Sequence, residues 1–311
     1  MGVPPYLQYL YVMRSGGGNA AEQAYIDRVE ADGGKIVKIG CVPDAIWDRP
    51  TITFTGLLDL YPGAAAAYSV RQLSTSATLS MRVRKDVSTV SEETDIGFVN
   101  NELDTAALLA FASNADNGDV FVVTWYDQSG SVPPNNAINS TAASQPKIVS
   151  SGAVLLDNGK PSIEFDGTDD SLSVSFGTTY THPNSIFTTC NKTDHSGYLF
   201  DGVSGALRHA QGNSTWVFSG AVLSNAYPNT DLGSQVVFTS IFDGANTSTY
   251  INGSNTVTGN AGTQGVSGLQ LGRIWNNVAP SLNGAIQEFI FYPSDQSSNR
   301  TGVESNINNY F

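Results

Sequence analysis

The sequence contains few cysteines, histidines and positive charges. Two of its 311 residues are cysteines, Cys41 and Cys190, and a disulfide framework needs more. The three histidines, His182, His195 and His209, do not have the spacing of zinc ligands. Basic residues number 15 against 28 acidic ones, which gives a net charge of −13. Because nucleic-acid binding normally needs a basic surface, we expect no nucleic-acid partner.

Long apolar runs are also missing. No stretch approaches the roughly 18 apolar residues of a membrane span, so we expect no membrane partner. The apolar segment from Tyr6 to Met13 is short, contains Gln8 and follows no basic residues. These features argue against a secretory signal.

What the chain does contain is enough apolar and aromatic residues to fold. Hydrophobic residues make up 40% of the sequence and aromatic residues 10%, whereas charged residues reach 14%. A typical domain has about 25% charged residues, so Ser, Thr, Asn and Gly must cover much of this surface. Such a surface suits a sugar-binding or particle-exposed protein, and it also occurs in many secreted β proteins.

The first part of the chain has a pattern of its own. Ser15-Gly16-Gly17-Gly18 has the composition of a flexible linker. Asn19 and Glu22 have the spacing of a capping box, and Gly33-Gly34 would end the helix that follows. Residues 35–41 alternate like a short strand. We therefore expect residues 1–55 to form a small α/β module and residues 56–311 to form the main domain.

The remainder of the sequence is dominated by short β patterns. Helical patterns are limited to residues 104–112 and 299–310, with a short helix or turn at 64–73. Asp166-Gly167 indicates a hairpin or tight turn, and Asn252-Gly253 indicates a hairpin. Strands are expected at 51–54, 80–85, 120–126, 162–165, 172–176, 236–242, 248–251, 256–258, 269–271 and 285–292. This pattern predicts an all-β sandwich of two antiparallel sheets.

Two groups of motifs resemble known families. The run Tyr126-Asp127-Gln128-Ser129-Gly130, within residues 67–161, resembles the catalytic sandwich of the alpha-L-arabinofuranosidase B family. The segments at 165–170, 250–253 and 283–292 are similar to the laminin-G or concanavalin A-like superfamily. Together these resemblances cover about residues 60–311. They imply a concanavalin A-like jelly roll, a fold that serves lectins, enzymes and adhesion modules alike.

A further resemblance implies a location. Residues 24–34 and 292–300 are similar to segments of phage virion structural proteins. The resemblance implies a virion protein whose residues 1–55 attach to other virion proteins. The sandwich would then face outward, toward glycan on the host cell surface.

The residues that catalyse hydrolysis in the arabinofuranosidase family have no match at the corresponding motifs. The family's nucleophile follows an F-D-Y-G-N-A-E run, and the nearest stretch here, Phe200 to Ala206, is followed by no Glu. The family's acid lies in a G-G-D-N-S-N loop, whose counterpart here is residues 272–277. A retaining glycosidase needs both carboxylates, so we expect no enzymatic activity. Relocated carboxylates at Asp201, Asp127 or Glu288 are the alternative, with Glu288 more typical of a structural strand residue.

Aromatic residues in polar loops are the main candidates for sugar binding. Indole rings stack on sugar faces and amides hydrogen-bond hydroxyl groups, although the same tryptophans could cap the core. Asp127 could equally hold the backbone of a corner, and Arg208 could lie at a solvated strand end. The candidate glycan-binding residues are Trp216, Trp275, Asn276, Asn277, Tyr126, Asp127, Asp201 and Arg208.

Three aspartates offer a candidate cation site. Asp166, Asp169 and Asp170 are close in sequence, and clustered carboxylates suit calcium. The alternative is a solvated Asp-Gly turn. We therefore expect no required cofactor, with calcium as a candidate ligand.

The sequence thus favours a non-catalytic phage surface protein (a spike, fibre, tail or decoration component) that binds host glycan. Three alternatives remain open: a lectin-like module without a virion role, a glycoside hydrolase of arabinofuranosidase type, and a structural virion component without a ligand. We expect a homo-oligomer, because virion proteins commonly assemble symmetrically. A trimer would suit a fibre or spike, although no heptad repeat supports any particular number.

Overall fold

The computed structural model describes residues 54–194, 197–203, 208–210, 216–226, 232–275 and 281–311. The expected α/β module of residues 1–55 lies almost entirely outside these ranges and stays a prediction. Within them, no helix is long and apolar enough to cross a membrane.

Strands make up most of the described chain, and the helices are short. The helices are α2 (Leu57–Leu60), α3 (Thr105–Ala112) and α4 (Arg300–Asn308). The first strands are β1 (Ala66–Ser69), β2 (Leu79–Val87), β3 (Val90–Val99), β4 (Glu102–Leu103), β5 (Val120–Trp125), β6 (Ala137–Ile138), β7 (Lys147–Ser150), β8 (Ala153–Val154), β9 (Leu156–Asp157), β10 (Lys160–Pro161) and β11 (Ile163–Asp166). The others are β12 (Leu172–Tyr180), β13 (Asn184–Lys192), β14 (Phe200–Gly202), β15 (Arg208–Ala210), β16 (Trp216–Phe218), β17 (Val222–Ser224), β18 (Val236–Phe242), β19 (Thr247–Ile251), β20 (Ser254–Gly259), β21 (Val266–Leu271) and β22 (Asn283–Tyr292).

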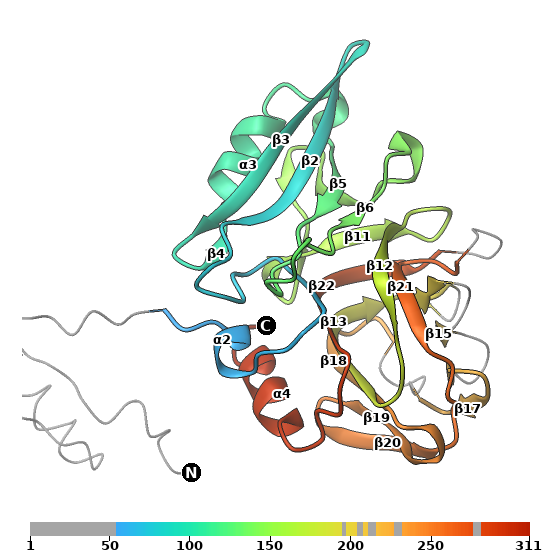
Figure 1. Ribbon diagram of the computed structural model, residues 1–311. Coiled ribbons are helices and arrows are strands. Elements are labelled where there is room, and N and C mark those ends of the chain that lie inside the picture. The colour runs from blue at the N-terminus through green and yellow to red at the C-terminus, as the bar shows by residue number, and fades with distance from the viewer. Residues whose placement is uncertain (1–53, 195–196, 204–207, 211–215, 227–231, 276–280) are drawn as a thin grey trace, which may run out of the picture. The chain divides into compact units, whose positions relative to one another are not determined.

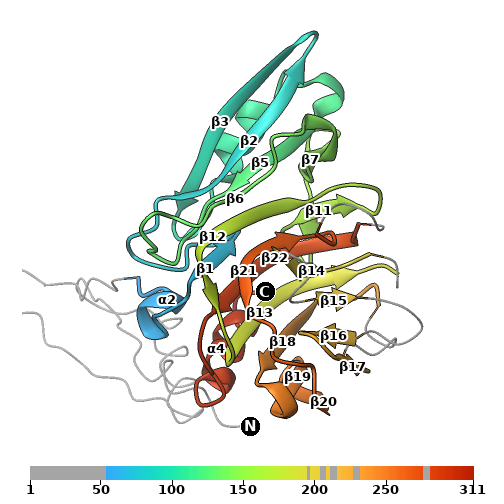
Figure 2. The ribbon, with the colours of Figure 1, turned by 45° about the vertical axis from the view of Figure 1, so that its right-hand side comes forward.

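Most of the strands form two antiparallel layers, and outside them β2 pairs with β3 and β5 (Figures 1 and 2). Layer A runs in the order β20, β19, β18, β13, β22, and β22 then pairs with both β1 and β11. Layer B runs β12, β21, β14, β15, β16, β17. Strand β5 connects the two layers. It pairs with β7, which pairs with β11 of layer A, and with β6, which pairs with β12 of layer B. The chain is therefore an all-β sandwich of antiparallel sheets, as its sequence predicts.

The main core fills the space between the layers. Ile186 and Phe289 of layer A lie in one buried cluster with Phe200 and Leu271 of layer B. The rings of Phe200 and Phe289 meet edge to face across the core, with centroids 5.6 Å apart. Burial of this apolar surface is the main force that holds the layers together.

A second apolar cluster covers the outer face of layer A. Ile290 and Tyr292 of β22 pack there against Val303 and Ile307 of α4. Strand β22 is thus buried on both faces, since successive side chains point to opposite sides of a sheet. This explains why its last four residues, Phe289 to Tyr292, form a continuous apolar run.

The ends of three elements agree with their sequence signals. Asp104 caps α3 by accepting a hydrogen bond from the amide of Ala107, at 2.9 Å. Asn252 and Gly253 both have positive φ and join β19 to β20 as a hairpin. Helix α4 begins at Arg300, and its buried residues include Val303 and Ile307.

Two local expectations need correction. The short helix or turn expected at residues 64–73 is wrong, because Ala66–Ser69 form strand β1. This strand pairs with β22 and is fully buried, so tertiary pairing overrides the helix preference of its alanines. Asp166-Gly167 does not close a hairpin, since β11 lies beside β22 whereas β12 lies beside β21. The turn instead carries the chain from one layer to the other.

Candidate functional site

Asp201 is a buried carboxylate on the outer face of layer B. It lies on β14, between Gln270 of β21 and Arg208 of β15. Its neighbours Phe200 and Leu271 belong to the core. Because side chains alternate along a strand, Asp201 and Gln270 point away from that core.

Asp201 and Gln270 hold the loop that follows β21. The carboxylate of Asp201 accepts hydrogen bonds from the amides of Trp275 and Gly202, each at 2.8 Å. The side-chain amide of Gln270 donates to the carbonyl of Ile274 at 3.2 Å. A hydrogen bond from a backbone amide to a charged carboxylate is strong, so it fixes the position of Trp275 in the loop. The Trp275 residue is half-buried.

A second tryptophan lies on the same sheet. Trp216 begins β16 and meets Tyr198 and Phe218 edge to face, with ring centroids 6.4 Å and 6.2 Å away. Strand β16 is two strands from β14, which at about 4.8 Å per strand places it roughly 10 Å away. Figure 2 shows β14 to β17 following one another in this order.

We use the name Asp201 site for Asp201, Gln270, Trp275, Trp216 and Tyr198. It brings together a polar anchor and half-buried aromatic rings on one face of layer B. This combination of rings and fixed polar groups can bind a sugar. Arg208 contributes its backbone to the adjacent strand, while Asn276 and Asn277 lie outside the described residues.

The structure places Tyr126 and Asp127 elsewhere, at the end of β5. The hydroxyl of Tyr126 donates to Asp95 of β3 at 2.7 Å. The carboxylate of Asp127 accepts hydrogen bonds from the amides of Ala67, Ser129 and Asn135, each at 2.9 Å. This geometry is that of a structural corner, the alternative that the sequence already raised for Asp127. Their role in glycan binding stays a prediction.

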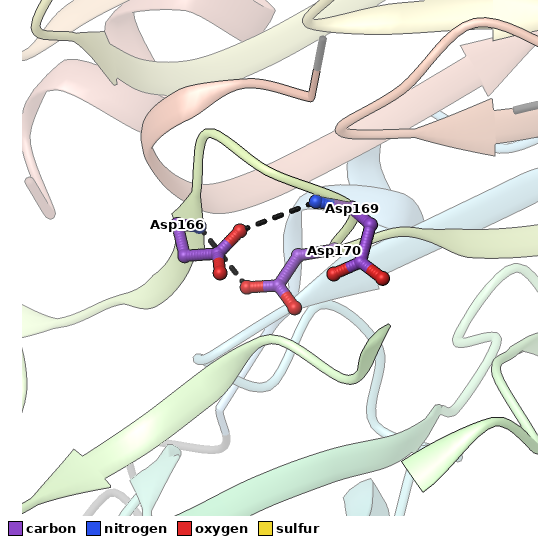
Figure 3. Close-up of side chains that lie close together, drawn as sticks. All are labelled: Asp166, Asp169 and Asp170. Carbon is purple, nitrogen blue, oxygen red and sulfur yellow. Dashed lines mark hydrogen bonds between the residues drawn. The ribbon is translucent and has the colours of Figure 1, made fainter. Parts of the chain in front are cut away.

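Asp166, Asp169 and Asp170 do come together at the turn between the layers (Figure 3). Each offers a carboxylate oxygen, and these oxygens lie within 4.8 Å of one another. Burial, with the negative charge of Asp166, raises the pKa of Asp170 to about 7. Calcium prefers such oxygen ligands, and the calcium expectation stays a prediction.

Glu288 is a structural residue. It is fully buried, and Arg71 binds both of its carboxylate oxygens, at 2.7 Å and 3.0 Å. Ser69 donates a third hydrogen bond to it at 2.8 Å. A carboxylate held in this way anchors the sheet, which agrees with the structural role that its strand position suggests.

Sequence reasoning missed Gln270 and Tyr198. Gln270 belongs to an ordinary alternating strand, and its role depends on the loop that folds back over it. Tyr198 becomes part of the site through a long-range contact with Trp216. One signal was available for Gln270: a polar residue between Leu269 and Leu271 must point away from the core.

No protein-family model and no curated protein matches the sequence. Solved structures do resemble the fold. An arabinofuranosidase complexed with arabinofuranosyl-alpha-1,2-xylobiose superposes with a TM-score of 0.58 and 15% identity, over 78% of this chain and 62% of that chain. A GH54 α-L-arabinofuranosidase soaked with a cyclic sulfate inhibitor gives a TM-score of 0.57 and 16% identity, over the same shares.

These likenesses establish the sandwich fold and correct one expectation. At this level of identity they show the fold alone, and the chain spans less than two thirds of either structure. The expectation that the chain is not an enzyme is contradicted, because both similar structures are arabinofuranosidases. The missing family motifs were therefore too narrow a basis for excluding catalysis. The fold is a β-sandwich that these arabinofuranosidases share.

Proposed function

We propose that this chain recognises glycans and that the Asp201 site binds an arabinofuranosyl group. The observation that carries the proposal is the fold shared with an arabinofuranosidase that holds an arabinofuranosyl-xylobiose, over 78% of this chain. Fold alone does not determine function, so the site must supply the rest of the argument.

The Asp201 site supports the proposal through its rings and its rigidity. The indole of Trp275 is half-buried, and its backbone is held by the buried carboxylate of Asp201. Trp216 is held edge to face by two other aromatic rings. Aromatic rings fixed before binding lose little conformational entropy when a sugar stacks on them.

Binding of arabinofuranosyl-xylobiose to the full chain tests this proposal by titration calorimetry. We expect Trp275→Ala and Trp216→Ala each to weaken binding at least tenfold, because each removes a stacking surface. Glu93→Gln is the control, since Glu93 is an exposed residue of β3 and is not a candidate binding residue. Equal binding by the wild type and both tryptophan variants would contradict the assignment of the site.

As a second candidate we propose that the bound arabinofuranoside is hydrolysed. The similarity to arabinofuranosidases favours this candidate. Glycoside hydrolysis generally needs two carboxyl groups at the scissile bond, one acting as acid and the other as base or nucleophile. Asp201 would act by holding the Trp275 loop in place. Release of 4-nitrophenol from 4-nitrophenyl α-L-arabinofuranoside is expected, with a rate at least tenfold lower in Asp201→Asn. Binding without release would limit the function to recognition.

We also propose that the chain is exposed on a phage particle, with residues 1–55 attached to other virion proteins and the sandwich facing host glycan. Support comes from the sequence motifs at residues 24–34 and 292–300. A homo-oligomer, such as a trimer, would suit this location. Mass spectrometry of purified particles, with light scattering of the isolated protein, tests both points; a particle without this chain would refute the location.

A further inference from the structure

A pocket of about 190 Å³ opens on the outer face of layer A. It lies between the β9–β10 hairpin and strands β11, β22 and β13. The Asp201 site lies on the outer face of layer B, so the pocket belongs to the other sheet of the sandwich. At about 30 Å³ per water molecule, the pocket has room for roughly six waters. This size suits one small ligand.

The floor of the pocket is set by strand register. Glu164 of β11 pairs with Ala285 of β22, which in turn pairs with Asn191 of β13. Residues paired across strands point to the same face, so two polar side chains flank the small Ala285. With about 4.8 Å between strands, Glu164 and Asn191 are roughly 10 Å apart. A larger residue at position 285 would fill the space between them.

The wall of the pocket is held by a buried glutamine. A β-bulge between Thr189 and Cys190 leaves Gln287 unpaired in the ladder between β13 and β22. The fully buried side-chain amide of Gln287 donates to the carbonyls of Asp157, Lys160 and Pro161, at 3.0 to 3.1 Å. These bonds dock the β9–β10 hairpin onto the sheet, so the pocket is shaped before any ligand binds.

Three of the polar side chains that line the pocket, those of Asp157, Glu164 and Asn191, offer hydrogen-bond acceptors. Asp157 accepts one bond from Asn191 at 3.2 Å through Oδ1. Its Oδ2 atom and the Oδ1 atom of Asn191 are buried and have no hydrogen-bond partner among the described residues. Burial of an acceptor without a partner is unfavourable, because the acceptor has lost its hydrogen bonds to water. Glu164 adds a third acceptor, and burial together with the charge of Asp157 raises its pKa.

The choice of ligand follows from these acceptors. A ligand that carries several hydroxyl donors would satisfy Asp157, Asn191 and Glu164 together. Leu156, which is 56% exposed, gives the pocket an apolar edge that can pack against the carbon face of a sugar ring. Among the described residues, the carboxylates grouped closely enough to hold a metal ion are Asp166, Asp169 and Asp170, which lie outside this pocket. The acceptors and the apolar edge together therefore favour a polyol, which has both hydroxyl donors and a carbon face.

We propose that this pocket binds a single sugar residue, as a second carbohydrate site on layer A. The assignment depends on the acceptors of the pocket and does not require the Asp201 site to bind glycan. A chain with both sites could hold a branched or multivalent glycan at two points, which strengthens attachment without new contacts at either point.

Saturation-transfer NMR on the full chain tests the proposal with a panel of L-arabinose, D-galactose, D-glucose and N-acetyl-D-glucosamine. The reference protein is Trp275→Ala, in which the Asp201 site is impaired and the pocket is intact. We expect at least one sugar of the panel to bind this reference protein. Asp157→Asn removes an acceptor and Ala285→Leu fills the floor without touching the acceptors. Each, added to the reference protein, is expected to weaken binding at least tenfold.

Glu93→Gln is the matched control, because Glu93 is an exposed carboxylate on β3. Thermal unfolding shows whether each variant is folded, and two pocket variants of different kinds keep the test decisive if one of them fails to fold. Failure of every sugar to bind the reference protein would overturn the proposal. So would binding that survives unchanged in a folded Asp157→Asn or Ala285→Leu variant. The Asp201 site is tested separately by comparing the wild type with Trp275→Ala. If both bind sugar equally, the Asp201 site alone has failed.

Discussion

Lys192 is fully buried at the end of β13, on the side of the strand that faces the core. Its ammonium group donates one long hydrogen bond, 3.4 Å, to the carbonyl of Gly197. Burial lowers the pKa of Lys192 to about 8, against an ordinary value of 10.5. A buried lysine is costly when charged, so this residue lowers stability at neutral pH.

The stability of the protein is therefore expected to rise between pH 8 and about 10. In this window the unfolded chain binds a proton at Lys192 that the folded chain has released, so the free energy of unfolding increases with pH. Lys192→Met should remove this slope and raise the free energy of unfolding at pH 7 by about 3 kcal/mol. Urea unfolding at several pH values measures both effects. Lys160→Met, at a partly exposed ion pair with Glu102, is the control and should change stability by at most about 1 kcal/mol. An unchanged slope in Lys192→Met would refute the argument.

Asp170 is expected to have the opposite pH dependence. Its pKa of about 7 lies above the ordinary 3.8, so the folded chain binds a proton that the unfolded chain has lost. This contribution to stability should be fully present below about pH 4 and should be lost as the pH rises through 7. Asp170→Asn should abolish this fall in chemical denaturation.

A bound calcium ion would favour the ionised carboxylates, so added calcium should raise the wild-type midpoint at pH 7 and leave that of Asp170→Asn unchanged.

At the scale of elements, the Arg71–Glu288 pair joins three parts of the fold. Glu288 lies on β22, and Arg71 follows β1 and donates to Asn306 of α4 at 2.9 Å. The guanidinium of Arg71 also lies over the ring of Tyr310, 5.0 Å from its centroid. One buried charge pair thus ties the strands to the terminal helix.

Breaking this pair is expected to be expensive. Glu288→Gln leaves the buried guanidinium of Arg71 without its countercharge, at a cost of about 3 kcal/mol or more. Asp95→Asn breaks the exposed pair with Arg82 and should cost less than about 1 kcal/mol. Denaturant unfolding of the two variants provides the comparison. Equal losses would show that burial does not determine the strength of these pairs.

Elements also show where local sequence signals were sufficient. Helix α3 and the β19–β20 hairpin depend on Asp104 and on Asn252-Gly253, which act within a few residues. Strand β1 was missed because its alanines favour a helix, and its strand state comes from pairing with β22, more than 200 residues away. Asp166-Gly167 forms a turn, as its residues indicate. The layers of its flanking strands β11 and β12 are decided by their distant partners, β22 and β21.

At the scale of the whole molecule, α4 covers the outer face of layer A (Figure 1). Val303 and Ile307 are fully buried against Ile290 and Tyr292. The helix is amphipathic, because it lies on the sheet with one face and meets solvent with the other. The sandwich therefore depends on its last residues as well as on its two sheets.

Ile307→Ala is expected to destabilise the whole domain by about 2–4 kcal/mol, because it leaves a cavity between the helix and the sheet. Ser305→Ala, on the exposed face of the same helix, should change stability by less than about 0.5 kcal/mol. Thermal unfolding of both variants tests this, with the loss expected as a single transition. A separate early transition for α4 would show that the helix is not part of the cooperative unit.

The sequence by itself determined the fold class, because strand alternation, turn residues and buried apolar runs are local properties that point to a two-layer β protein. It also indicated Trp216 and Trp275 as candidate site residues from expected polar loops, and Asp201 from the resemblance of residues 200–206 to a family motif, although Trp216 lies on β16 and not in a loop. Tertiary structure decided which of these share a face, through the bond from Trp275 to Asp201 and the order of β14, β15 and β16. It alone revealed the pocket at Asp157, because strands β11, β22 and β13 meet there from separate parts of the chain. The partner of a strand can lie anywhere in the sequence, so a local sequence pattern cannot identify it.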